Sequence, residues 1–312
     1  MQKFFKYLLR MVLIVFILLN IVIAFHAYKF THFYNTGELG INPLPKKKKP
    51  GIKELLFGIN TEKQKNLAPD SGYQTVILTT KDGIQLEGWY IPVNNAKGTV
   101  CLFHGHGGTK TGTNAPAEAF RKLGFNTFQL DFRAHGNSQG NTCTIGYTES
   151  EDVKLAYDFI QNQGEKNIVL WGVSLGASTI TKAMFDYKTI QPKKVILEMP
   201  FGTIEDAVKG RMRMMGLPEQ PISTLLTFWG GVEHGFWAFN IQPEEYAKQI
   251  YCPALLQWGK KDNRVSKNEE DILFANLAST NKKFVVYNEC GHENICLKEN
   301  SKWLSEVKAF IQ

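Results

Sequence analysis

Six short runs of mostly apolar residues recur along the chain, and they constrain the fold more than any other feature. They span residues 99–104, 127–132, 168–173, 195–199, 254–258 and 284–287. A strand with one wet face alternates apolar and polar residues, whereas continuous apolar runs suit parallel strands that helices cover on both sides. Segments with helical periodicity separate most of these runs, so their order predicts a doubly wound α/β fold.

The expected helices and the first two strands complete this pattern. Helical periodicity is found in residues 115–123, 149–161, 175–187, 267–277 and 298–311. Two β-rich runs, residues 73–80 and 84–93, flank Lys81-Asp82-Gly83, and an Asp-Gly pair in this setting is typical of a hairpin turn. We therefore expect a mostly parallel, eight-stranded sheet that begins with an antiparallel hairpin, in a domain over residues 71–312.

One long insertion interrupts the alternation of strands and helices. Residues 201–247 have no strand pattern but are rich in methionine and aromatic residues. A segment of this length normally carries structure of its own. Two interpretations are open: a flexible lid over an apolar pocket, or an ordinary helical subdomain whose aromatic side chains form its core.

The N-terminal segment is apolar enough to cross a membrane. Residues 11–25 contain one polar residue, Asn20, and the whole apolar run reaches the roughly 20 residues that a spanning helix needs. We expect a transmembrane anchor over residues 4–28. A cleaved signal peptide is the alternative, because Lys3, Lys6 and Arg10 form a basic start, but the run exceeds the usual length of about 7–15 residues. The same basic residues favour a non-cytoplasmic location for the domain that follows.

The region after this segment reads as a juxtamembrane linker over residues 29–70. It combines prolines and glycines with four consecutive lysines at 46–49, and one short helix is expected near residues 52–57. The formal net charge of +7 owes much to these lysines and to the basic N-terminus. We assign that charge to a membrane surface, with a simple solvated linker as the equal alternative, and expect no nucleic-acid partner.

The five cysteines do not identify the compartment. An odd number leaves at least one thiol unpaired. Cys290 and Cys296 could pair in an oxidising compartment, but free buried thiols are the simpler expectation.

A Gly-x-Ser-x-Gly string, Gly172-Val173-Ser174-Leu175-Gly176, lies where the run at 168–173 passes into a helix. A sharp strand-to-helix turn lifts a serine hydroxyl out of the sheet, and flanking glycines leave room for its backbone. The helix N-terminus behind it stabilises developing negative charge. The string is weak evidence alone, but in this context it predicts that Ser174 is a nucleophile.

A glycine-rich loop, His104-Gly105-His106-Gly107-Gly108, follows the strand at the start of the parallel series. Backbone N–H groups in such a loop can approach a substrate oxygen, so we expect an oxyanion hole from the amides of His106 and Leu175. His104 is expected to brace the loop. A metal site at His104 and His106 is a rival interpretation, but no third ligand follows at short spacing. Lys110 lacks the preceding glycine of a phosphate-binding loop, and we expect neither metal nor cofactor.

Asp262 and His292 supply the partners that a serine nucleophile needs. Each follows a predicted strand, and the chain order is serine, carboxylate, histidine. Imidazole, with an unperturbed pKa of about 6.5, can take the serine proton and return it to the leaving group. A carboxylate fixes the imidazole tautomer and stabilises the imidazolium. The competing carboxylates rank below Asp262; they are Asp271, Glu289 and Glu293.

Together these residues resemble the alpha/beta-hydrolase family, specifically its bacterial serine-aminopeptidase-like and membrane-anchored members, from about residue 73 to the C-terminus. The segment Asp131-Phe132-Arg133-Ala134-His135-Gly136-Asn137-Ser138 is similar to an Asp-x-Arg-x-x-Gly-x-Ser loop of these proteins. The resemblance implies that Asp131 and Arg133 support the site, as His104 and Gly105 do from the glycine-rich loop. It also places residues 201–247 at the family's cap position, where specificity is set.

The expected chemistry is two-step acyl transfer, in which Ser174 attacks a carbonyl carbon and water then releases the acid. The aromatic insertion and the anchor favour an ester or thioester with an apolar, lipid-like acyl group. An aminopeptidase or amidase is the runner-up, for which cap carboxylates such as Glu233, Glu244 or Glu245 would bind a substrate amine. A catalytically silent, ligand-binding protein is the alternative from another class.

Overall fold

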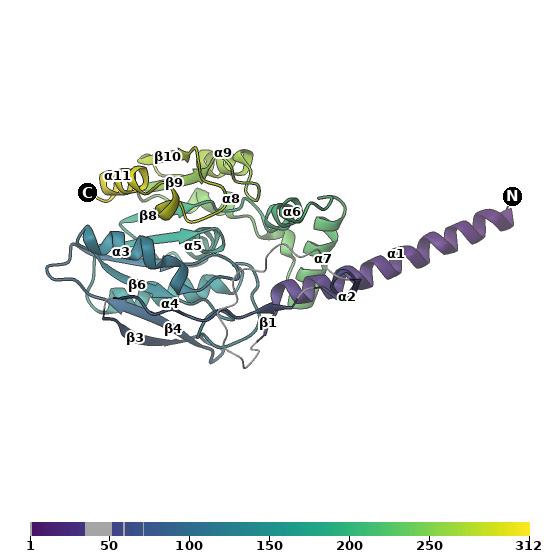
Figure 1. Ribbon diagram of the computed structural model, residues 1–312, viewed down its shortest axis with the longest axis horizontal. Helices are drawn as coiled ribbons and strands as arrows, with labels where there is room; N and C mark the ends of the chain where they lie inside the picture. Colours follow the sequence, from purple (N-terminus) through teal and green to yellow (C-terminus); the bar gives the residue numbers. More distant parts are fainter. Residues whose placement is uncertain (1, 35–51, 59, 71) are drawn as a thin grey trace.

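An eight-stranded sheet forms the centre of the domain, in the order β3-β4-β6-β5-β7-β8-β9-β10 (Figure 1). Its strands are β3 (Gln74–Thr79), β4 (Gln85–Ile91), β5 (Thr99–Phe103), β6 (Asn126–Leu130), β7 (Ile168–Val173), β8 (Lys194–Glu198), β9 (Ala254–Gly259) and β10 (Lys282–Tyr287). Only β4 runs antiparallel to both of its neighbours, so the predicted mostly parallel sheet with an initial hairpin is confirmed. The structure is a computed structural model that describes residues 2–34, 52–58, 60–70 and 72–312.

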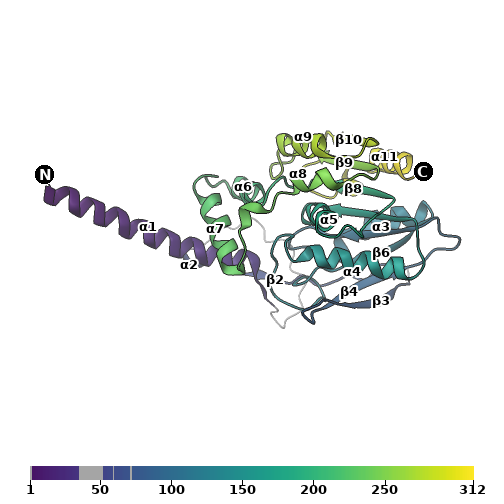
Figure 2. The same ribbon diagram turned by 180° about the vertical axis from the view of Figure 1, so that it is seen from behind.

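Helices cover both faces of this sheet, which explains the uniformly apolar central strands. One face carries α3 (Asn114–Lys122), α10 (Ile295–Lys298) and α11 (Asn300–Ile311), and the other carries α4 (Glu149–Asn162), α5 (Leu175–Asp186) and α9 (Lys267–Asn276) (Figures 1 and 2). Every residue of β5 and of β9 is buried. Strands in this position have no wet face, so no polar alternation marks them in the sequence.

The insertion between β8 and β9 is helical, as its cap position implies. It contains α6 (Ile204–Met215), α7 (Ile222–His234) and α8 (Pro243–Tyr246), with short 3-10 turns η2 (Ala238–Asn240) and η3 (Ala247–Gln249). Thr203 caps α6 by accepting the Asp206 N–H at 3.0 Å, and Gly216 ends the helix in a left-handed conformation. The apolar side chains of the insertion are divided between interior and surface: Met212 is buried, whereas Phe228 and Trp237 are exposed.

The N-terminal helix α1 (Gln2–Thr31) projects from the domain beside the cap (Figures 1 and 2). Among the described residues it is the one helix long and apolar enough to span a membrane, a test that an N-terminal signal sequence also passes. Its C-terminal part packs against α7, where Ile23 and Ala27 are buried. Asn20, the polar exception in the run, accepts a hydrogen bond from the indole N–H of Trp229 at 3.0 Å.

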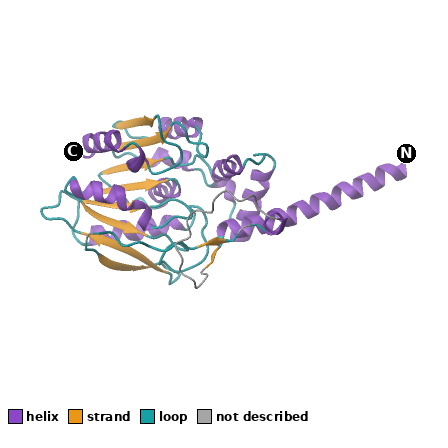
Figure 3. Ribbon diagram, viewed as in Figure 1, coloured by secondary structure: helices purple, strands orange, loops and turns teal. Residues whose placement is uncertain are grey.

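The chain after α1 is more firmly attached to the domain than its composition indicated. The strand β1 (Phe33–Tyr34) pairs in parallel with β2 (Thr61–Glu62), and α2 (Ile52–Phe57) lies beside α1 (Figure 3). Phe33 is only 1% exposed, and its N–H donates to the carbonyl oxygen of Asn141 at 2.7 Å. The buried ring of Phe33 and the backbone hydrogen bonds beside it attach this segment, and composition reveals neither. The lysines at 46–49 lie outside the described residues, and the segment boundaries expected from sequence stay predictions.

Candidate active site

Ser174 lies in a sharp turn between β7 and α5. Its φ is 53°, a left-handed value that is strained for a residue other than glycine. The flanking glycines are required by close approach: a Cβ on Gly172 would lie 2.5 Å from the carbonyl carbon of Gly176, and one on Gly176 would lie 2.2 Å from the carbonyl oxygen of Phe103. The turn thus presents a serine hydroxyl at the carboxyl end of the sheet, with the side chain 8% exposed.

His292 and Asp262 reach this hydroxyl from the loops after β10 and β9. The Nε2 atom of His292 is 3.0 Å from Ser174 Oγ, and its Nδ1 atom is 2.7 Å from Asp262 Oδ2. A carboxylate only accepts, so Nδ1 carries the proton and Nε2 is free to accept from the serine. The second Asp262 oxygen accepts the backbone N–H groups of Arg264 and Val265 at 2.7 and 3.0 Å, which fixes the carboxylate plane.

The competing carboxylates contact lysines rather than His292. Asp271 pairs with Lys267, Glu289 with Lys261, and Glu293 with Lys298. The cysteines near His292 are not bonded to each other: all five cysteines fall within the described residues, and all are free thiols.

The glycine-rich loop lies against the turn that holds Ser174. A Cβ placed on Gly105 would come within 3.5 Å of the Ser174 Cβ, so the loop and the serine are in direct contact. Within the described part of the chain, the backbone N–H groups of His106 and Leu175 donate no hydrogen bond. Both amides are therefore available beside the hydroxyl.

The His104 ring holds the loop from below. Its Nδ1 atom is 2.8 Å from the carbonyl oxygen of Gly105, and its Nε2 atom accepts the backbone N–H of Phe132 at 3.1 Å. Burial lowers the pKa of His104, so the ring is a neutral hydrogen-bonding brace. No group of three or more metal-ligating side chains gathers here or elsewhere in the described residues.

Asp131 anchors the loop that follows β6. It accepts the backbone N–H of Lys110 at 2.7 Å and that of Asn137 at 3.0 Å, and the Lys110 ammonium group lies 2.5 Å from it. Gly136 is required beside it, because a Cβ at this position would lie 2.2 Å from Asp131 Oδ2 and the φ of 48° disfavours other residues. The carboxylate thereby joins this loop to the segment after the glycine-rich loop.

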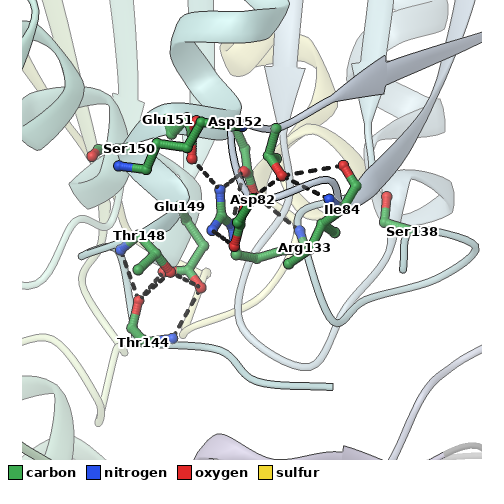
Figure 4. A network of polar contacts seen from close by, with 12 residues as sticks. Asp82, Ile84, Arg133, Ser138, Thr144, Thr148, Glu149, Ser150, Glu151 and Asp152 are labelled. Atoms are coloured by element: carbon green, nitrogen blue, oxygen red, sulfur yellow. Dashed lines mark hydrogen bonds and ion pairs between the residues drawn. The ribbon is translucent and has the colours of Figure 1, made fainter. Parts of the chain in front are cut away.

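Arg133 ties the same loop to the start of α4 (Figure 4). Its Nε and Nη2 atoms donate to Asp152 Oδ1 at 2.9 and 2.6 Å, and Nη2 also donates to Glu151 at 2.9 Å. Burial opposes the charge, but these two carboxylates outweigh it and raise the pKa of Arg133. The guanidinium group is a buried structural cation. Its hydrogen bonds go to Asp152 and Glu151, and none goes to Ser174 or His292.

The end of α1 contributes directly to this region. The Phe30 ring stacks on the His106 ring with centroids 4.7 Å apart, and Phe33 contacts His106 edge-on at 5.3 Å. Burial, together with the positive charges of Arg211 and Arg264, lowers the pKa of His106 to about 3. The glycine-rich loop therefore carries a neutral imidazole that contacts two aromatic rings of the N-terminal segment.

Comparisons with known proteins identify the fold. Residues 94–228 match the family model of the serine aminopeptidases S33, a segment that contains the glycine-rich loop and Ser174. An esterase of Pyrococcus furiosus, Pf2001, superposes with a TM-score of 0.66 over 79% of this chain and 94% of that chain, at 24% identity. The chain has the alpha/beta-hydrolase fold.

Two curated relatives extend the similarity without adding an activity. The uncharacterized protein YqkD of Bacillus subtilis is 21% identical over 68% of this chain and 70% of its own length. The protein bem46 of Schizosaccharomyces pombe is 24% identical over 72% of each chain. Neither name states an activity, so these two similarities leave the substrate open.

Several residues around the site carry no sequence signal for the three-dimensional position they occupy. Lys110 looks like a surface lysine, yet its side chain is fully buried against Asp131. Asp152 looks like an ordinary acid in the first turn of a helix, where such residues are common. Phe30 and Phe33 look like interfacial aromatic residues at the end of a membrane helix. The role of each of these residues becomes clear only when the residue that it contacts in three dimensions is known.

Proposed function

We propose that the chain is a serine hydrolase that cleaves an ester or thioester with an apolar acyl group. The observation that carries the proposal is the linear arrangement of Ser174, His292 and Asp262, with oxygen-to-nitrogen distances of 3.0 and 2.7 Å. These are hydrogen-bond distances for a nucleophile, its base and the group that orients the base.

The proposed reaction proceeds in two acyl-transfer steps. The Ser174 oxygen attacks the carbonyl carbon while His292 Nε2 takes the hydroxyl proton, and Asp262 stabilises the resulting imidazolium. The oxyanion accepts hydrogen bonds from the amides of His106 and Leu175. His292 then protonates the departing alcohol or thiol, and it activates a water molecule that hydrolyses the acyl-enzyme.

A cavity between α1 and α7 supports an apolar acyl group. Its volume is about 670 Å³, and its walls include Phe16, Ile21, Phe25 and Trp229. Such a space suits a hydrocarbon chain, because burial of each CH₂ group contributes about 0.8 kcal/mol. The cavity lies along the helix that is apolar enough to enter a bilayer, so a lipid-like substrate is the natural occupant.

We further propose that α1 is an uncleaved, single-pass anchor and that the hydrolase domain lies on the non-cytoplasmic face. A helix of 30 residues is about 45 Å long, which exceeds the roughly 30 Å apolar core of a bilayer and leaves its last turns for packing on the cap. The basic residues Lys3, Lys6 and Arg10 precede the apolar run and favour a cytoplasmic N-terminus. Protease accessibility of the domain in sealed vesicles tests the orientation.

The deciding experiment uses the full chain in detergent with a fluorophosphonate probe and 4-nitrophenyl esters of increasing acyl length. We expect covalent labelling and a rate that rises with chain length. Ser174→Ala is expected to lose both labelling and turnover. Ser178→Ala is the matched control, because Ser178 lies one turn further along α5 and bonds to the backbone of Phe201 instead.

Two outcomes would redirect the proposal. Faster cleavage of N-terminally free peptide amides than of any ester would favour the aminopeptidase or amidase that the S33 family model describes. An intact, folded chain that neither labels nor turns over any of these substrates would favour a silent, ligand-binding protein.

A further inference from the structure

Two arginines beside the site, Arg211 and Arg264, have no hydrogen-bond or ion-pair partner for their guanidinium groups among the described residues. Both side chains are partly buried. Three other buried or partly buried arginines do have a partner: Arg133 pairs with Asp152 at 2.6 Å, Arg213 pairs with Glu219 at 3.2 Å, and Arg121 donates to the Thr127 hydroxyl at 3.3 Å.

Arg211 lies one aromatic ring away from the glycine-rich loop. Its guanidinium carbon is 5.8 Å from the centre of the Phe30 ring, and that ring stacks on His106 at 4.7 Å. The amide of His106 is one of the two proposed oxyanion donors. A cation of the cap helix α6 thus lies one aromatic ring away from the side chain of His106.

Arg264 lies two residues after Asp262, on the loop that carries this carboxylate. Its backbone N–H donates to Asp262 at 2.7 Å. Gly210, the neighbour of Arg211, packs against it so closely that a Cβ would lie 2.2 Å from the Arg264 carbonyl oxygen. The two segments that carry the arginines are therefore in direct contact.

The charges of the two side chains act on each other and on the loop. Burial and the charge of Arg264 both lower the pKa of Arg211, and the charges of both arginines lower the pKa of His106. The acid nearest in sequence, Asp262, is already occupied by His292 and two backbone N–H groups. The charge of Asp262 only partly offsets the burial of Arg264, and Arg211 has no acid near it among the described residues that offsets its own burial. Two like charges in this partly desolvated setting raise the free energy of the empty site.

We propose that Arg211 and Arg264 together bind an anionic group of the substrate, a carboxylate or phosphate, held close to the scissile carbonyl. The planar guanidinium fork suits both groups, because each presents paired oxygens. The inference rests on the proposed hydrolase function and narrows its substrate to an acidic amphiphile with an apolar acyl chain. It also disfavours an aminopeptidase, because the same two cations would repel a substrate ammonium group.

The test compares matched esters that differ only in the acidic group, using the full chain in detergent. One pair is a 1-acylglycerol 3-phosphate and the 1-acylglycerol with the same chain, and the other is a 4-nitrophenyl hemiester of a dicarboxylic acid and its methyl ester. We expect the wild-type chain to prefer the acidic member of at least one pair, and the pair that shows the preference identifies phosphate or carboxylate as the ligand.

The variants are Arg211→Gln, Arg264→Gln and the double variant, with Lys209→Gln as control because Lys209 lies on α6 and pairs with Asp206. The double variant should lower kcat/KM for the acidic ester at least about 10-fold, mainly through KM, and leave the neutral ester and fluorophosphonate labelling nearly unchanged. Arg211→Lys should retain part of the preference. Equal losses on acidic and neutral esters, or no wild-type preference, would overturn the proposal.

Failure of the hydrolase function itself is recognised separately. If the folded chain hydrolyses no ester and is not labelled, binding of dodecyl phosphate and of sodium dodecanoate is compared with binding of dodecanol to the Ser174→Ala chain by equilibrium dialysis. The anion site then predicts tighter binding of at least one acidic ligand, which the double arginine variant weakens about 10-fold or more. Equal binding of all three ligands would contradict the proposal of an anion site.

Discussion

At the scale of single residues, Glu198 forms hydrogen bonds both to the turn that holds Ser174 and to two buried tryptophans. Its carboxyl Oε1 accepts the indole N–H groups of Trp171 and Trp303 at 2.9 and 2.6 Å, and its backbone carbonyl accepts the N–H of Ser174 at 2.8 Å. Burial raises the pKa of this glutamate from 4.5 to about 7. The side chain is thus a hydrogen-bond acceptor whose charged form is disfavoured in the folded protein.

We predict that Glu198→Gln flattens part of the pH profile of stability. Because the folded-state pKa is raised, the contribution of the wild-type carboxyl is fully present below about 4.5 and is lost as pH rises to about 7. A glutamine keeps an oxygen for the two indoles but does not ionise. Urea unfolding followed by tryptophan fluorescence should show the variant gaining stability relative to wild type between pH 5 and pH 8.

The control for this prediction is Glu198→Leu, which removes the acceptor itself. It leaves two buried N–H groups unpaired and should cost about 1–3 kcal/mol for each at both pH values. Parallel pH profiles for wild type and Glu198→Gln would show that the buried carboxyl does not titrate differently in the folded and unfolded chains.

Ser174, Asp262 and His292 could be identified from sequence because each follows a predicted strand, and parallel strands bring their carboxyl ends to one edge. Residues whose place depends on a partner from a distant segment could not. Nothing near Arg211 in the sequence indicates that Phe30 lies under its guanidinium group, and nothing near Arg133 indicates Asp152. Strand ends are local features, whereas side-chain partners are properties of the packed chain.

At the scale of elements, α7 contains two adjacent glycines in different surroundings. A Cβ on Gly230 would meet no atom within 4 Å, whereas one on Gly231 would lie 2.6 Å from the carbonyl oxygen of Phe236. The second glycine lets the chain after α7 fold back on the helix. The first has no such role and only weakens the helix.

We predict that Gly230→Ala and Gly231→Ala have opposite effects on stability. The first should raise the free energy of unfolding by about 0.5–1 kcal/mol, because alanine loses less backbone entropy in a helix. The second should lower it by about 1–3 kcal/mol, because the obstructing atoms belong to the backbone and cannot rotate away. Urea unfolding of the two variants under identical conditions tests the difference in sign, and effects of the same sign would contradict the packing described for this helix.

The helices and strands themselves were predictable to within about two residues at most ends. The run at 168–173 coincides with β7, and the helix expected at 149–161 is α4 (Glu149–Asn162). The sequence signal failed where one residue decides the outcome. Residues 33 and 34 had the composition of a linker, but the burial of Phe33 makes them a strand attached to the domain.

At the scale of the whole molecule, the apolar N-terminal helix and the site form one packed unit. Phe33 is buried between His106 and His135, with ring centroids 5.3 and 4.4 Å away. The backbone continues the attachment, because the Cys143 N–H donates to the carbonyl oxygen of Thr31 at 2.8 Å. Changes at the end of α1 should therefore reach the glycine-rich loop.

We predict that Phe33→Ala lowers stability by about 3–5 kcal/mol and also lowers kcat/KM, because a buried ring is lost and His106 loses one of its two aromatic supports. Phe5→Ala is the control, since Phe5 lies on α1, the helix that precedes Phe33, and 67% of its surface is exposed. Ester hydrolysis and urea unfolding of the full chain in detergent measure both effects. A Phe33→Ala chain as active and stable as Phe5→Ala would show that the helix end does not support the loop.

The direct passage from α1 into β1 has a geometric consequence. Only His32 separates the last residue of the helix from Phe33, so there is no slack between the two. When the helix is embedded in a bilayer, Ser174 is held at a fixed distance from the lipid surface. A long flexible linker would instead let this distance vary. A membrane-bound substrate could then be cleaved only if its scissile bond lies at the same distance from the lipid surface as Ser174. This distance would restrict the choice of substrate in addition to the shape of the pocket.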